Sequence, residues 1–163
     1  MALTSRITML GAVVGAEWTT TVPSRPAALA DCISFAPPPS IRHFEQAELL
    51  LDPETVPTGE AEDARIAGHV RPIEGRPLDA AWLTMIGDWF PPSPFRRLLP
   101  PTGGVSIDYT VHVHRTLPSS PDLWLEGVFD TGTSVDGIAL EHGTLATPDG
   151  RPVAETFHTR WTA

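Results

Sequence analysis

The stretch that decides the fold is residues 77–92, which read PLDAAWLTMIGDWFPP. Apolar side chains recur there at helical spacing and form one stripe, as expected of a helix that packs on a core. Pro77 suits the first helical position, where its missing N–H costs nothing, and Pro91 and Pro92 stop the helix. We therefore predict one long helix from Pro77 to about Phe90. The stripe consists of Leu78, Ala81, Trp82, Met85, Ile86 and Trp89.

Strands are predicted on both sides of this helix. Residues 64–73 alternate in polarity before it, and several alternating segments separated by turn residues follow it. Gly137 and Gly143 interrupt one of these segments, which suggests bulges or strong curvature. Neighbouring strands joined by short turns favour an α+β fold with one helix and a curved antiparallel sheet. The strands predicted after the helix are 105–115, 123–130, 135–147 and 151–161.

The alternation is clearest in residues 105–115, where period-2 geometry assigns each side chain to one of two faces. One face carries Val105, Ile107, Tyr109, Val111 and Val113. The other face carries Ser106, Asp108, Thr110, His112 and His114. The pattern therefore places Ser106 and Tyr109 on opposite faces. His112 and His114 could form half of a metal site, but no third ligand is evident, and we expect neither a metal nor a cofactor.

The segment before residue 64 is rich in proline and harder to assign. We predict strands over 7–22 and 27–35, and a short helix over 44–51. The apolar run after Arg6 also resembles a short secretory signal peptide, so this alternative to a strand stays open.

A short repeated motif is relevant to the domain organisation. Residues 24–28 (SRPAA) resemble residues 150–154 (GRPVA), as expected of a duplicated unit. We therefore interpret 1–36 as the closing strands of a shortened first copy. The proline-rich stretch 37–63 is expected to be a linker. Residues 64–163 then form the complete domain.

Composition excludes several classes of function. The chain has 163 residues and a formal net charge of −9, and all 11 of its basic side chains are arginine. No basic stripe is present to neutralise the phosphates of a nucleic acid. No apolar run approaches the ~20 residues of a membrane span. Cys32 is the single cysteine, which excludes an intramolecular disulfide. We expect a cytoplasmic protein with no nucleic-acid or membrane partner.

Three motifs follow one another in the second half of the chain: GDWFPP at 87–92, SIDYTVHVHR at 106–115 and DGRPVA at 149–154. Together they resemble the C-terminal repeat of the double-hotdog acyl-CoA thioesterase II family, over roughly residues 66–163. The resemblance implies a hotdog fold, in which a sheet wraps around a central helix. Because a double hotdog needs two such helices and one is evident here, we expect a homodimer or higher homo-oligomer.

The resemblance also implies catalytic positions. In the family an Asp at the helix end, a Thr or Ser that opens the next strand and a Gln on the final strand hold the attacking water. The matching residues are Asp88, Ser106 and His158, so that His158 replaces the Gln. Asp88 suits a general base, and Ser106 could orient the water. His158 could polarise the water or be the base itself with Asp88 orienting it. A nucleophilic Ser106 is a further reading, although no G-x-S-x-G elbow is present.

Our first hypothesis is an enzyme of lipid or polyketide metabolism that hydrolyses an acyl-CoA or carrier-bound acyl thioester with activated water. One alternative is a non-hydrolytic hotdog protein that binds, dehydrates or cyclises an acyl or polyketide-like intermediate. Another is a non-catalytic subunit of a hotdog assembly. Trp82, Met85 and Trp89 are candidates for lining the acyl site. The basic residues expected to meet an anionic carrier such as coenzyme A are Arg96 and Arg97, with Arg115 as an alternative.

Overall fold

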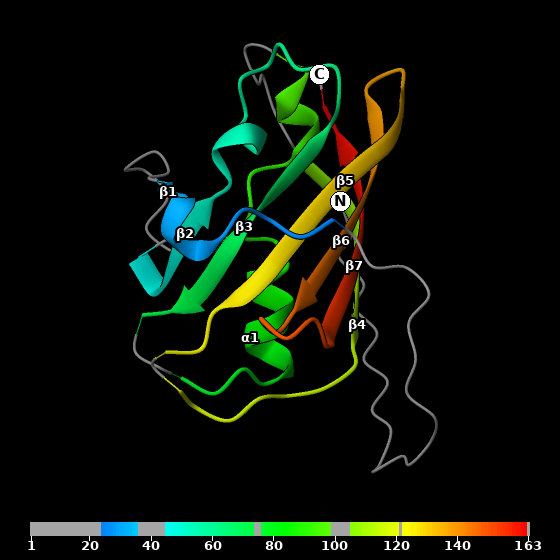
Figure 1. The fold of residues 1–163 in the computed structure, drawn as a ribbon. Coiled ribbons are helices and arrows are strands. Elements are labelled where there is room, and N and C mark those ends of the chain that lie inside the picture. The colour runs from blue at the N-terminus through cyan, green and yellow to red at the C-terminus, as the bar shows by residue number, and fades with distance from the viewer. Residues whose placement is uncertain (1–23, 36–44, 74–75, 99–104, 121, 163) are drawn as a thin grey trace.

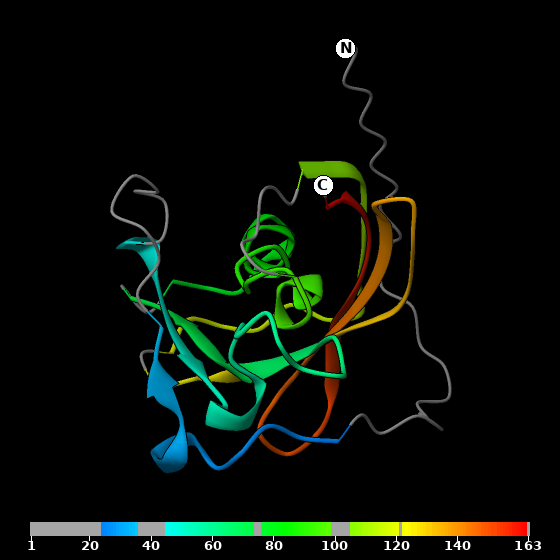
Figure 2. The ribbon, with the colours of Figure 1, turned by 90° about the horizontal axis from the view of Figure 1, so that it is seen from above.

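The computed structural model describes residues 24–35, 45–73, 76–98, 105–120 and 122–162, so the strand predicted over 7–22 lies outside the described residues. In the described part, a seven-stranded antiparallel sheet curves around one α-helix (Figure 1). The view from above shows the sheet wrapping around that helix (Figure 2). No helix in these ranges is long and apolar enough to cross a membrane.

The strand order is β1-β2-β3-β5-β6-β7-β4, which places β4 at one edge of the sheet. The five strands predicted from residue 64 onward are confirmed, although β5 continues to Val135. Short 3-10 turns lie at Leu29–Asp31 (η1), Pro53–Thr55 (η3) and Ser93–Arg96 (η4). The strands are β1 (Ile33–Ser34), β2 (Ala47–Leu51), β3 (Arg65–Pro72), β4 (Val105–Val113), β5 (Leu125–Val135), β6 (Ile138–Ala146) and β7 (Pro152–Trp161).

The helix α1 spans Ala80–Ile86 and is shorter at both ends than predicted. It begins after Asp79, whose carboxylate accepts the backbone N–H of Trp82 at 2.9 Å and so caps the first turn. It ends at Gly87, where the chain turns toward the sheet. Leu83 and Ile86 are fully buried and anchor the helix in the core. Together with residues from β2, β3, β5 and β7 they form one hydrophobic cluster.

The first part of the described chain differs from the sequence-based prediction. The helix expected over 44–51 is wrong: β2 forms there and pairs with β3. Its side chains Ala47, Leu49 and Leu51 are buried because they alternate along a strand whose inner face lies on the core. Part of the stretch 37–63, interpreted as a linker, therefore belongs to the sheet. The strand expected over 27–35 is reduced to η1 and the two-residue β1.

A bulge in β4 changes the predicted faces of that strand. Its register against β7 shifts between Ser106 and Asp108, so that Ser106 lies opposite Arg160 and Tyr109 lies opposite His158. Ile107 supplies the extra residue and is 54% exposed. The expectation that Ser106 and Tyr109 face opposite sides is therefore wrong, because one inserted residue brings both to the inner face.

The two glycines that suggested bulges have other roles. Gly137 has φ +79° and follows Asp136 with φ +51°, so the pair makes the tight turn between β5 and β6. Gly143 lies against the Phe129 ring and the Thr156 side chain, where a Cβ would come within 2.3 Å of both. Gly143 is therefore needed for close packing, and the register shifts of β6 occur elsewhere.

Candidate active site

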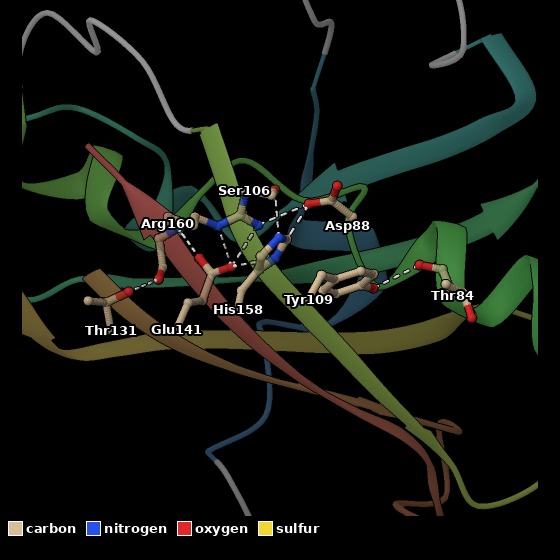
Figure 3. A network of polar contacts seen from close by, with 9 residues as sticks. Thr84, Asp88, Ser106, Tyr109, Thr131, Glu141, His158 and Arg160 are labelled. Carbon is tan, nitrogen blue, oxygen red and sulfur yellow. Dashed lines mark hydrogen bonds and ion pairs between the residues drawn. The ribbon is translucent and has the colours of Figure 1, made fainter. Parts of the chain in front are cut away.

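Asp88, Ser106 and His158 come together from three separate segments (Figure 3). His158 on β7 has its Nε2 2.7 Å from the Ser106 hydroxyl on β4. Its Nδ1 lies 3.6 Å from Oδ1 of Asp88, which follows α1 after Gly87. The three residues that the resemblance singled out therefore surround one imidazole ring.

The turn after α1 directs Asp88 toward the sheet. The Asp88 backbone N–H donates to Met85 O at 3.1 Å. Gly87 lets the chain pass close to β4 and β7, because a Cβ there would lie 2.4 Å from the Tyr109 hydroxyl. Tyr109 donates its hydroxyl to Thr84 O at 2.8 Å and so ties β4 to the helix. These contacts fix the distance between the helix and the two strands that carry the other site residues.

The His158 ring is buried and held from several sides. Its side chain is 1% exposed, and the Tyr109 ring stacks on it with the centroids 4.3 Å apart. Burial, assisted by the positive charge of Arg160, lowers the pKa of His158 to about 4, so the ring is neutral near pH 7. Burial also raises the pKa of Tyr109, with the negative charge of Asp88 adding to the effect.

The surroundings of His158 favour one tautomer. Its Nδ1 has no hydrogen-bond partner in the described part of the chain, but two carboxylate oxygens lie near it, from Asp88 at 3.6 Å and Glu141 at 3.8 Å. Negative oxygens attract a proton to the facing nitrogen, so we infer an N–H at Nδ1. Nε2 then accepts a hydrogen bond from the Ser106 hydroxyl. The lone pairs of the Ser106 oxygen stay available to accept a hydrogen bond from another donor.

Two charged residues that sequence reasoning missed complete the network. Arg160 on β7 donates from Nε to Oε1 of Glu141 on β6 at 2.9 Å, and its Nη2 lies 3.0 Å from Asp88 Oδ1. Arg160 and Glu141 are almost fully buried, with side chains 4% and 2% exposed. The alternation of β7 was a usable signal for Arg160, which lies two residues from His158 and so shares its face. The sequence around Glu141 contains no pattern that predicts the burial of its side chain.

The residues predicted to bind substrate are spread over several places. Trp82 and Met85 line an open cavity of about 290 Å³ together with Gln46, Arg76 and Ala81. This cavity lies on a different face of α1 from Thr84, which binds Tyr109.

The other three predicted binding residues differ in exposure. Trp89 is only 1% exposed. Arg96 is buried, and its guanidinium donates to the Asp63 carboxylate and Val56 O, which favours a structural role. Arg97 is exposed.

The histidine pair of β4 has its own contacts away from this site. The His112 ring meets Phe157 edge-on, and His114 Nε2 lies 3.8 Å from a Glu155 oxygen. Within the described ranges, no group of three or more His, Cys, Asp or Glu side chains could hold a metal ion.

A comparison with protein families assigns the chain. A family model described as the acyl-CoA thioesterase C-terminal domain matches residues 16–161. The chain belongs to this family. The match includes β1 and β2, which lie before residue 64. It therefore covers more of the chain than the resemblance seen in the sequence motifs, which began at about residue 66. Among curated proteins, none matches this member of the thioesterase family.

Solved structures share the fold. A conserved protein of unknown function with a hotdog fold from Alicyclobacillus acidocaldarius is 21% identical, with a TM-score of 0.75, over 91% of this chain and 58% of that one. A protein of Novosphingobium aromaticivorans named as a candidate thioesterase is 21% identical, with a TM-score of 0.72, over 95% and 58%. A hypothetical thioesterase of Streptococcus pneumoniae solved with coenzyme A is 12% identical, with a TM-score of 0.54, over 74% and 88%. The predicted hotdog fold is confirmed, and the chain spans 58% of the length of the first two proteins.

Proposed function

We propose that this chain carries a hydrolytic site for acyl thioesters, at which Asp88, Ser106 and His158 activate water. The observation that carries the proposal is the convergence of three residues, distant in the sequence, on one buried imidazole ring. Membership of the acyl-CoA thioesterase C-terminal domain family supports the reaction class.

Asp88 is the proposed general base. Its side chain is 45% exposed, and all its carboxylate contacts to described residues go through Oδ1, which leaves Oδ2 for a water molecule. Asp88 takes a proton from the water as the water oxygen attacks the thioester carbonyl carbon. The carbon–sulfur bond then breaks, and the proton passes to the leaving thiolate. The products are a carboxylic acid and a free thiol.

Ser106 is proposed to orient the water. His158 is proposed to polarise it through Ser106, because both nitrogens of its buried ring already face described side chains. The low pKa of His158, about 4, makes it a weak base and favours this polarising role over the one in which His158 is the base. Ser106 donates to His158 Nε2 and can accept a hydrogen bond from the water with a free lone pair. The nucleophilic reading of Ser106 loses support for the same reason, because it needs His158 to accept the serine proton.

The substrate and its carrier are also proposals. Coenzyme A in the Streptococcus pneumoniae structure supports an acyl-CoA, and we propose that the cavity at Trp82 and Met85 receives an apolar part of it. Exposed Arg97 could meet a phosphate. Cytoplasmic lipid or polyketide metabolism stays the predicted setting.

The assembly is proposed from the free edge of the sheet. Ser106 lies on β4, the edge strand, so a second hotdog domain paired there would adjoin the site. We propose a homodimer or higher homo-oligomer, in which a second copy supplies the other hotdog domain. The predicted division into a shortened first repeat over 1–36 and a complete domain over 64–163 does not fit the sheet, because β1 and β2 extend it beyond β3. The chain spans 58% of the length of two longer hotdog proteins, which supports a second domain from another copy.

One observation favours the non-hydrolytic alternative, a hotdog protein that binds or rearranges an acyl intermediate. Oδ1 of Asp88 is already bound by the Arg160 guanidinium at 3.0 Å. A carboxylate partly committed to an arginine has one oxygen left for catalysis instead of two.

Thiol release from acetyl-, octanoyl- and palmitoyl-CoA separates these functions. The wild type is expected to release thiol from at least one of them, and Asp88→Asn to be slower by about 100-fold or more. His158→Gln should keep much of the activity, since an amide oxygen can also accept the hydrogen bond from Ser106. Binding without thiol release by the wild type would favour the non-hydrolytic alternative. Equal turnover by the wild type and Asp88→Asn would remove Asp88 from the mechanism.

A further inference from the structure

Glu141 and Arg160 are two buried charges with no direct part in the proposed reaction. Their side chains are 2% and 4% exposed, and Arg160 Nη2 lies 2.8 Å from Glu141 Oε1, with a second bond from Nε at 2.9 Å. Burying an ion pair costs several kcal/mol of desolvation per ion, so a gain in stability does not by itself explain why this pair is buried.

Glu141 is fixed on its other side as well. Its Oε2 accepts the Ser93 backbone N–H at 2.6 Å, in η4 beyond the turn that carries Asp88. Ser93 in turn has its hydroxyl 2.8 Å from the Thr131 hydroxyl on β5. The Glu141 carboxylate is therefore held by Arg160 on β7 and by Ser93 of η4, which Thr131 on β5 supports in turn.

Arg160 extends this rigid anchor to the edge of the site. Its Nη2 contacts Asp88 Oδ1 at 3.0 Å, although Glu141 already pairs with the same guanidinium (Figure 3). Asp88 is half-exposed, while its two supports are buried. A pair that only stabilised the sheet would not need a third, solvent-reaching carboxylate.

We propose that Glu141 and Arg160 are positioning residues: Glu141 fixes Arg160, and Arg160 holds one oxygen of Asp88 so that the other faces the substrate. This inference deepens the proposed function and rests on it. Neither residue touches the reacting atoms. They contribute by holding the Asp88 side chain in its reactive orientation before the substrate binds, so that no conformational entropy is lost during the reaction.

Steady-state kinetics on an acyl-CoA that the wild type hydrolyses give the first test. Arg160→Lys keeps the charge but loses the planar fork, and Glu141→Gln keeps the shape but loses the charge. Both are expected to lower kcat by about 10- to 100-fold with KM little changed, because misplacing a reacting group by about 1 Å costs that much. Glu126→Gln, in a second glutamate–arginine pair whose glutamate is 9% exposed, is the matched control and should keep wild-type kcat.

NMR titration of the His158 ring gives a second test that needs no turnover. The ring is faced by Asp88 after α1, by Glu141 on β6, by Arg160 on β7, and by Ser106, Asp108 and Tyr109 on β4. Arg160 lowers the pKa of His158 and Glu141 raises it. Arg160→Gln should therefore raise that pKa, while Glu141→Gln should keep the ring neutral to even lower pH. Simple loosening of the core would raise the pKa in both variants.

The outcomes are distinguishable. Folded Arg160→Lys and Glu141→Gln proteins with undiminished kcat would overturn the positioning role and leave the proposed function intact. A rise of the His158 pKa in both the Arg160→Gln and Glu141→Gln variants would also overturn it. No thiol release by the wild type from any acyl-CoA would instead contradict the proposed function itself.

Discussion

The sheet contains two clusters with the same kinds of side chain, each built around a buried glutamate. In the Glu126 cluster, Glu126 on β5 lies opposite His69 on β3 and pairs with Arg25. In the Glu141 cluster, Glu141 on β6 lies opposite His158 on β7 and pairs with Arg160. Each cluster thus combines a glutamate, an arginine and a histidine across neighbouring strands, and composition alone does not distinguish them.

Their outer contacts differ. Arg25 and His69 bind backbone oxygens, of Pro148 and Ala27, and so fasten chain segments to the sheet. Arg160 and His158 contact side chains instead, those of Asp88 and Ser106, which lie toward the edge strand and solvent. The comparison teaches that a buried ion pair indicates a candidate site when its second contact is a chemically reactive, accessible side chain.

Removal of the arginines should give the largest difference in stability between the clusters. Arg160→Met leaves Glu141 buried without its charge partner and should lower the free energy of unfolding by about 3–5 kcal/mol. Arg25 is 52% exposed, so water can replace it, and Arg25→Met should cost only about 1 kcal/mol. Chemical denaturation of both variants measures this. Equal losses would contradict the distinction drawn between the two clusters.

Acid should act on the Glu141 cluster through His158. The pKa of this ring falls from 6.5 to about 4 on folding, so the unfolded chain binds its proton at higher pH. The corresponding stability is fully present above pH 6.5 and is lost as the pH falls through about 4. The loss is at most about 3 kcal/mol. The free energy of unfolding of His158→Gln should depend less on pH over this range than that of the wild type. If the two free energies differed by the same amount at every pH, His158 would not be the source of the acid sensitivity.

A smaller effect is expected from Gly143, which lies between the clusters opposite Phe129. Gly143→Ala would push a methyl group into the Phe129 ring and Thr156 and should cost about 1–3 kcal/mol. Gly132→Ala is the control, since a Cβ there meets nothing within 4 Å, and should change stability by no more than about 0.5 kcal/mol. Thermal unfolding compares them. Equal shifts in Tm for the two variants would mean that a methyl group at position 143 is tolerated without loss of stability.

Much of the sheet could be predicted from the sequence because its signals are local. Strands β3 to β7 show alternating polarity and end at glycine or proline turns, and the apolar stripe located α1. Strand β2 was missed because its short run AELLL suits a helix as well as a strand, and its pairing with β3 is not local. Helix length was overestimated, since capping by Asp79 and the turn at Gly87 depend on the folded environment.

The site was predicted in part. Asp88, Ser106 and His158 were named from a family resemblance, and the structure brings them together. The alternation of β4 alone gave the wrong face for Ser106, because a bulge is a one-residue irregularity without a clear signature at Ile107. Glu141 could not be identified, since a charged residue is normally expected at the surface and its burial depends on the distant Arg160 and Ser93.

The central claim is that the Glu141 cluster supports a reactive Asp88, whereas the Glu126 cluster only holds the fold. The most direct measurement compares kcat/KM for thiol release by Asp88→Asn and Glu126→Gln, with the acyl-CoA that the wild type hydrolyses fastest. Asp88→Asn should lose about 100- to 10,000-fold, as expected for a missing general base. Glu126→Gln should match the wild type. Retained activity in Asp88→Asn, or an equal loss in both variants, would contradict the claim.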